Sequence, residues 1–131
     1  MEKIRRKYIC KHQIKKGIGG IKNLIKYKKQ NFSTALMIDQ RVSEGIFSNF
    51  FDQRALTTTI PAQLIKKFKI PVVPIHIQRN NGPNFKITIQ KPIIFSEENS
   101  IQNITDKLNY VLENLIKIKP EQWIWSHNRW K

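Results

Sequence analysis

The sequence predicts an α/β chain in which helices flank strands, and three segments carry that prediction. Residues 100–118 show the clearest helical pattern, with apolar side chains at steps of three and four. Residues 71–90 alternate apolar and polar side chains around the turn-forming residues 80–84, as a β-hairpin does. Residues 33–38 are almost continuously apolar, which favours a strand covered on both faces.

The N-terminal third is predicted to be mostly helical. Residues 2–9 place apolar side chains four apart, and residues 18–29 carry an apolar stripe with lysines on the opposite face. Between these two segments, residues 9–14 alternate weakly and predict a short strand.

Two further helices have clear boundary signals. Three threonines at 57–59 before Pro61 predict a helix start, because a hydroxyl can accept from open N–H groups and proline fits the first turn. That helix is expected to end near Phe68. In the last helix, Ser100 is the expected N-cap, and Pro120 is expected to end it.

Asp39 and Gln40 directly follow the apolar run at 33–38. In α/β sheets, functional groups gather just beyond the carboxyl ends of strands, so these two residues are candidate site residues. A carboxylate that caps the next turn is the structural alternative for Asp39.

The last twelve residues contain all three tryptophans of the chain, interleaved with Glu121, His127 and Arg129. Trp is costly to expose, and its indole N–H needs a partner when buried. The tail is therefore expected to dock onto the core through its aromatic side chains, or else to line an amphipathic site.

The tail reads P-E-Q-W-I-W-S-H-N-R-W-K, and residues 35–79 run in order through an apolar segment, D-Q, a glycine-containing loop, two phenylalanines, A-L-T, a helix, P-V-V-P and an arginine. In both blocks the chain resembles the bacterial lipid A biosynthesis acyltransferases, the lauroyl/myristoyl transferase family. Several motifs in the family's order, over nearly the whole chain, make the resemblance specific.

This resemblance implies transfer of a fatty acyl chain from acyl carrier protein to a hydroxyl of a lipid A precursor, a phosphorylated glycolipid. It also implies a peripheral place at the cytoplasmic face of the bacterial inner membrane, with an anionic membrane surface as a further partner. No cofactor, metal or nucleic acid is expected. Another glycolipid acceptor remains open as an alternative within the class.

The family's general base is a His followed five positions later by an acid, and this sequence has no such pair. Gly17 stands five positions after His12, Asn81 five positions after His76, and the sequence ends before that position after His127. In the family this signature lies upstream, behind a membrane-spanning helix.

The chain therefore reads as the C-terminal portion of an acyltransferase-like mixed sheet flanked by helices. We expect residues 1–131 to form a single incomplete domain, inactive by itself, with a separately encoded N-terminal half as a candidate partner. A truncated gene and a misassigned start codon remain open as explanations.

Matching motifs gives three groups of candidate site residues. Those expected to bind substrate or support the site are Asp39, Gln40, Arg79, Glu121, His127 and Arg129. Those expected to line an acyl groove or contact lipid are Phe50, Phe51 and Trp125, where the two phenylalanines lie in a predicted loop at 41–56 and could equally plug the core. Those expected to meet an anionic headgroup are Arg5, Arg6 and Lys7.

Composition keeps two other classes open. A net charge of +15 favours an anionic partner, although Ile, Lys and Asn make up 51 of the 131 residues, which is typical of codon drift in an AT-rich genome. A small nucleic-acid-binding protein is the second hypothesis, but no recognised RNA-binding signature is present and the tryptophans cluster at one end. A non-catalytic module with residues 18–29 on anionic lipid is the third.

Compartment signals in the sequence are few. The start carries no apolar signal-peptide region, and no run approaches the ~18 apolar residues that span a bilayer. The single Cys10 cannot form an internal disulfide, so a reducing compartment is the default.

Overall fold

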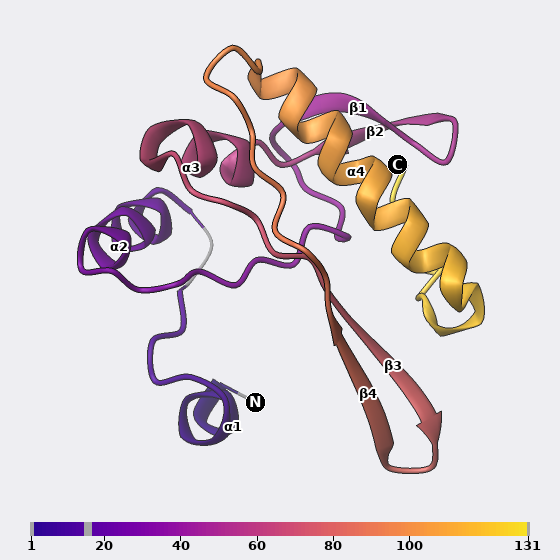
Figure 1. The fold of residues 1–131 in the computed structure, drawn as a ribbon. Helices are drawn as coiled ribbons and strands as arrows, with labels where there is room; N and C mark the ends of the chain where they lie inside the picture. Colours follow the sequence, from indigo (N-terminus) through magenta and orange to yellow (C-terminus); the bar gives the residue numbers. More distant parts are fainter. Residues whose placement is uncertain (1, 15–16, 131) are drawn as a thin grey trace. The chain divides into compact units, whose positions relative to one another are not determined.

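The computed structural model describes residues 2–14 and 17–130, which fall into two compact units divided after Leu36. The α/β prediction is confirmed: the described residues form four α-helices, one short 3-10 helix and two two-stranded antiparallel sheets (Figure 1). Each unit is described by itself below.

The first unit contains both predicted N-terminal helices, α1 (Glu2–Tyr8) and α2 (Ile18–Lys29). The strand predicted at 9–14 is wrong, because no strand forms in this stretch. The His12 ring lies instead 4.6 Å from Tyr27 and 5.3 Å from Phe32, centroid to centroid. An aromatic contact with α2 therefore holds this segment, where the sequence predicted strand pairing.

The strand predicted at 33–38 is also wrong, since these residues adopt no regular secondary structure. Met37 is 78% exposed, whereas a strand covered on both faces would bury it. Only Ile38 packs against a core cluster. A strand forms when a neighbour satisfies its backbone groups, and no strand of the described residues pairs with this segment.

The second unit begins with a hairpin where the sequence predicted a loop at 41–56, and that prediction is wrong. Strands β1 (Ile46–Phe50) and β2 (Gln53–Thr57) pair antiparallel through a two-residue turn. Both turn residues have positive φ, 50° at Phe51 and 59° at Asp52, as two-residue hairpin turns require. Among residues other than glycine, Asp is one of those that adopt positive φ most readily.

Gly45 fits tightly just before this hairpin. A Cβ at this position would overlap the carbonyl group of Thr57, at the end of β2. Because Gly45 has no side chain, the backbone just before β1 can approach the Thr57 carbonyl closely.

Two of the helices, α3 (Ile60–Phe68) and α4 (Ile101–Ile118), form as predicted and pack against each other. The Ser100 hydroxyl accepts a hydrogen bond from the Asn103 N–H at 3.0 Å, and the Asn103 side chain accepts one from the Ser100 N–H at 3.1 Å. This reciprocal cap fixes the start of α4. The first core cluster of the unit consists of Ala62, Ile65, Ile104 and Leu108.

The second hairpin comprises β3 (Ile75–Asn81) and β4 (Asn84–Ile89), as the alternating pattern predicts, although β3 begins four residues later than expected. Its two-residue turn includes Gly82, at φ 53°. An isolated antiparallel bridge between Val72 and Ile93 joins the segment that precedes β3 to the segment that follows β4. Figure 1 shows β3 and β4 side by side along the length of the hairpin, which projects away from α3.

The tail docks onto the core, which confirms the first of the two expectations for it. After α4 comes the 3-10 helix η1 (Pro120–Gln122). Trp123 and Trp130 then pack against a second core cluster formed by Phe50, Ala55 and Ile116. Among the described residues, no helix is both long and apolar enough to cross a membrane.

Candidate functional site

Arg129 fastens the tail to the first hairpin. Its side chain is only 1% exposed. One terminal nitrogen, Nη1, donates to the Leu56 carbonyl at 2.6 Å, and Nη2 donates to the Thr57 hydroxyl at 2.9 Å. The guanidinium carbon lies 5.5 Å from the centre of the Phe50 ring. This predicted site residue therefore acts as a bidentate clamp on β2.

Two opposing effects act on the pKa of Arg129. Burial lowers the pKa of the Arg129 guanidinium, because its charged form loses water, while the nearby Asp39 carboxylate raises that pKa. Asp39 and Arg129 were both predicted as site residues, and the structure brings them within electrostatic reach of each other. The Nε of Arg129 has no hydrogen-bond partner among the described residues.

Asn109 on α4 is the centre of the buried hydrogen bonds under this clamp. It is fully buried, and its amide nitrogen donates to the Ser48 hydroxyl at 2.8 Å, to the Asn49 carbonyl at 3.1 Å and to the Thr57 hydroxyl at 3.2 Å. Thr57 thus contacts both Asn109 and Arg129. The amide oxygen of Asn109 has no partner among the described residues.

Sequence reasoning missed Asn109, because the apolar stripe of α4 drew attention to its neighbour Leu108. A signal was present. Thr105, Asn109, Leu112 and Ile116 follow each other at steps of four, three and four, which marks a second inward-facing stripe.

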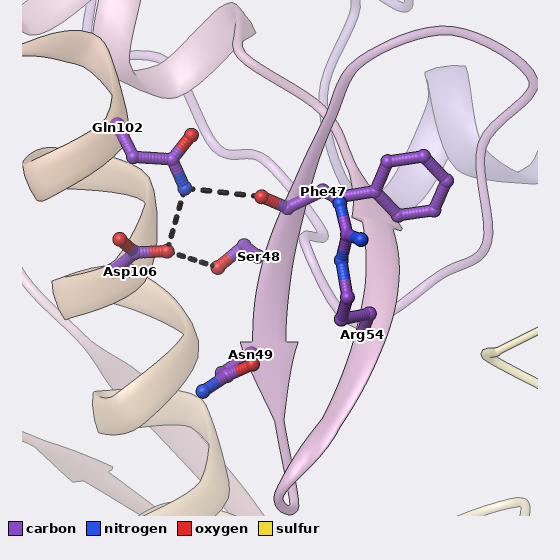
Figure 2. A pocket seen from close by; sticks show the side chains of 6 residues that line it. All are labelled: Phe47, Ser48, Asn49, Arg54, Gln102 and Asp106. Carbon is purple, nitrogen blue, oxygen red and sulfur yellow. Dashed lines mark hydrogen bonds between the residues drawn. The ribbon is translucent and has the colours of Figure 1, made fainter.

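A shallow hollow lies beside this network, between β1 and α4 (Figure 2). The Ser48 hydroxyl donates to Asp106 Oδ1 at 2.6 Å, and the Gln102 amide donates to the same oxygen at 2.9 Å and to the Phe47 carbonyl at 3.0 Å. The volume of the hollow is about 390 Å³. Its lining residues are Phe47, Ser48, Asn49, Arg54, Gln102 and Asp106.

None of the residues that line this hollow was predicted from the sequence. Asp106 Oδ1 is already engaged by two donors, so the hydrogen bonds serve first to hold α4 on β1. Among the described residues, no group of three His, Cys, Asp or Glu side chains could hold a metal ion.

The tail also contacts the second hairpin, through Gln122. The Arg79 N–H donates to Gln122 Oε1 at 2.9 Å, and Gln122 Nε2 donates to the Arg79 carbonyl at 2.8 Å. The Arg79 side chain remains exposed, with its guanidinium carbon 4.9 Å from the centre of the Phe85 ring. Gln122 was missed by sequence reasoning, which weighed the charged and aromatic residues of the tail.

The remaining predicted residues of this unit are placed as follows. Gln40, Glu121 and His127 are exposed, and their part in a site stays a prediction. Trp125 is 45% exposed, and its indole N–H donates to the Pro120 carbonyl at 2.7 Å.

The two phenylalanines differ from each other. Phe50 is fully buried, so the structure shows the core plug that was one of its two alternatives. Phe51 is half-buried, and its N–H donates to Glu113 Oε1 at 2.9 Å. The Lys117 ammonium lies 5.7 Å from the centre of the Phe51 ring. A lipid contact of Phe51 stays a prediction.

In the first unit, Arg5, Arg6 and Lys7 occupy the last turn of α1 and are exposed. The Lys7 ammonium lies 5.0 Å from the centre of the Tyr8 ring. Their expected contact with an anionic headgroup stays a prediction.

The described residues thus form an α/β fold onto which a tryptophan-rich tail docks through a buried arginine. A family model described as bacterial lipid A biosynthesis acyltransferase matches residues 4–131. The chain therefore belongs to the bacterial lipid A biosynthesis acyltransferase family, and its role is acyl transfer in that pathway. No curated protein matches the chain.

Proposed function

We propose that this chain is the C-terminal part of an acyltransferase that moves a fatty acyl chain from acyl carrier protein to a hydroxyl of a phosphorylated lipid A precursor. The observation that carries the proposal is the family match over residues 4–131. The chain works at the cytoplasmic face of the inner membrane, where acyl carrier protein and an anionic membrane surface are its partners.

Acyl transfer needs several chemical groups, of which these residues supply only some. A base must take the proton of the acceptor hydroxyl, donors must stabilise the developing oxyanion, and cations must meet the phosphates. Exposed Arg79 is a suitable cation for a phosphate. None of the three histidines is followed five positions later by an acid. We therefore expect these residues to be inactive by themselves, with the base supplied by residues outside them.

In this proposal the tail positions the site. Arg129 joins the tail to the end of β2, and Gln122 joins the tail to β3. Both contacts are made by residues of the family's closing motif. Arg129 is thus a positioning residue, which holds the tail against the end of β2.

Reconstitution tests the proposal. The full chain is assayed for acyl transfer from labelled acyl carrier protein to a lipid A precursor, alone and with an N-terminal half that carries the family's His and acid pair. We expect product only from the combination. The matched control is the same N-terminal half with its His replaced by Ala, which should give none.

Two outcomes would contradict the proposal in different ways. Product from the chain alone would overturn its inactivity, and no product from the combined halves would overturn the transferase role. Offering other glycolipids as acceptors in the same assay identifies the substrate.

A further inference from the structure

We infer that one face of the β3–β4 hairpin docks onto an anionic lipid membrane. The register pairs Ile75 with Ile89 and Ile77 with Ile87, and residues directly opposite in a hairpin point to the same face. Phe85, which pairs with Arg79, lies on that face too. We call this surface the isoleucine face: Ile75, Ile77, Phe85, Ile87 and Ile89.

The isoleucine face is uncovered. Its side chains are between 53% and 68% exposed, and neither core cluster of the described residues includes any of them. Scattered exposed apolar residues are ordinary on a protein surface, but a contiguous apolar face marks a binding surface.

The opposite face of the hairpin is polar. His76 pairs with Thr88, and Gln78 pairs with Lys86. His76 and Gln78 are half-buried, whereas their neighbours Ile75 and Ile77 are not. The hairpin is therefore amphipathic, and its apolar side is the one turned to solvent.

The positive charge of the hairpin indicates an anionic partner. No Asp or Glu occurs between Asp52 and Glu97. Arg79 lies on the isoleucine face itself, while Lys86 on the opposite face and Lys91 after the hairpin add positive charge nearby. A surface that joins apolar side chains to unopposed cations complements acyl chains beneath anionic headgroups.

The Arg79 guanidinium stacked on Phe85 places a cation at the turn end of the isoleucine face. The apolar ring and the cation can then face acyl chains and headgroups respectively.

The hairpin lies flat at the membrane surface and does not enter the hydrocarbon. A two-stranded sheet leaves outward-facing backbone groups without a strand partner, and those groups cannot be satisfied by acyl chains. At the headgroup level, water and phosphates satisfy them, while the isoleucine face reaches the upper acyl carbons, as other amphipathic elements do.

The inference rests on the proposed function in one respect, that a lipid acceptor is met at a membrane surface. Its test uses vesicles that contain no acyl donor and no lipid A precursor. Failure to bind them would leave the proposed acyl transfer standing, and failure of acyl transfer would leave the docking surface standing.

The first experiment measures co-sedimentation of the full chain with phosphatidylcholine vesicles, with and without phosphatidylglycerol. The double variant I77N/I87N should bind the anionic vesicles about tenfold more weakly, because two isoleucines no longer leave water. The matched control Q78N/T88N, at the adjacent positions on the opposite face, should bind like the parent chain. Urea unfolding midpoints verify that both variants fold.

Salt separates the two contributions in the same assay. Arg79→Gln should weaken binding about fivefold at low salt, and this difference should fade as salt rises. The tenfold effect of I77N/I87N should persist, because apolar contact is not screened.

A second experiment locates the contact. In a Cys10→Ser chain, Ile87→Cys and Thr88→Cys are each labelled with an environment-sensitive dye. We expect a blue shift with anionic vesicles, and quenching by spin-labelled lipid, at position 87 only. An equal response at both positions, or at neither, would overturn the inference.

Two further outcomes would assign the face or the binding elsewhere. If the parent chain dimerises in sedimentation and I77N/I87N does not, the face binds a second copy. If I77N/I87N binds vesicles as the parent does, the basic first unit carries the binding. Either outcome would overturn the inference.

Discussion

The two hairpins of the second unit are built alike and buried in opposite ways. Each pairs two short antiparallel strands through a two-residue turn. The first hairpin buries a face with two hydroxyls, Ser48 and Thr57, beside Phe50 and Ala55. The second leaves isoleucines exposed. The more apolar face is thus the uncovered one.

This contrast shows that hydrophobicity alone does not decide burial in this chain. The first hairpin is covered because α4 and the tail supply specific donors and acceptors, with Asn109 and Arg129 satisfying the hydroxyls. Buried polar groups are tolerated when they are paired. The second hairpin has no such cover among the described residues, apart from the hydrogen bonds of Gln122.

The largest expected effect compares one phenylalanine on each hairpin. Phe50→Ala should lower the free energy of unfolding by about 3–5 kcal/mol, because Phe50 is fully buried against Trp123 and Trp130. Phe85→Ala, at a side chain 53% exposed, should change it by less than about 0.5 kcal/mol. Urea unfolding of both variants measures the difference. Equal losses would mean that the second hairpin is covered after all.

The next effect compares one arginine on each hairpin. Arg129→Leu should lower the free energy of unfolding by about 3 kcal/mol, because two buried acceptors lose their charged donor. These acceptors are the Leu56 carbonyl and the Thr57 hydroxyl. Arg79→Leu should change stability by less than about 0.5 kcal/mol, since the hydrogen bonds of Arg79 to Gln122 use its backbone. Thermal unfolding checks both. A small loss for Arg129→Leu would show that the tail docks through its tryptophans alone.

The third comparison introduces a glycine into the turn of the first hairpin and removes one from the turn of the second. Asp52→Gly should stabilise the first hairpin by about 0.5 kcal/mol, because glycine adopts φ 59° without steric cost. Gly82→Ala should weaken the second hairpin by about 1 kcal/mol, since alanine at φ 53° is strained. The exposed second hairpin can open locally, so amide hydrogen exchange in β3 and β4 is the measurement for Gly82→Ala. Unchanged exchange would contradict the expectation.

The smallest effect concerns pH at the segment that follows the second hairpin. The Lys69 ammonium lies 2.5 Å from Glu97 Oε1, and this hydrogen bond and charge lower the pKa of the Glu97 carboxyl from its ordinary value of 4.5. A depressed acid pKa adds stability above that ordinary value, which is lost as pH falls through the lowered pKa. Both side chains are exposed, so the effect on unfolding should be slight.

Carboxyl NMR titration measures this pKa directly. We expect Lys69→Gln to return the Glu97 value to its ordinary range. A low Glu97 pKa that survives the substitution would assign the shift to something other than Lys69.

The elements that sequence reasoning predicted correctly are those whose signals are local. Helix α4 carries its own cap at Ser100 and its own apolar stripe, and β3–β4 carries alternation around Gly82. Such patterns specify structure within a few residues. The family resemblance was equally readable, because its motifs are short and ordered.

The predictions from sequence failed where contacts with residues distant in the sequence determine the structure. The first hairpin turns at Phe51 and Asp52, which lack the Asn-Gly signature of such turns, and its buried hydroxyls resemble loop residues. Segment 33–38 is apolar enough for a strand, but strand formation depends on a pairing partner that the pattern itself does not reveal. Arg129 was selected through the family motif, while its burial depends on contacts 72 and 73 residues away.

The side chain of Gln122 has a consequence for self-association. By taking both the N–H and the carbonyl of Arg79, its amide behaves like one residue of an adjoining strand. A foreign strand that tried to extend the sheet along β3 would first have to displace it. Exposed strand edges are where amyloid-like stacking begins, so one glutamine in the tail protects the hairpin with the exposed isoleucine face against aggregation.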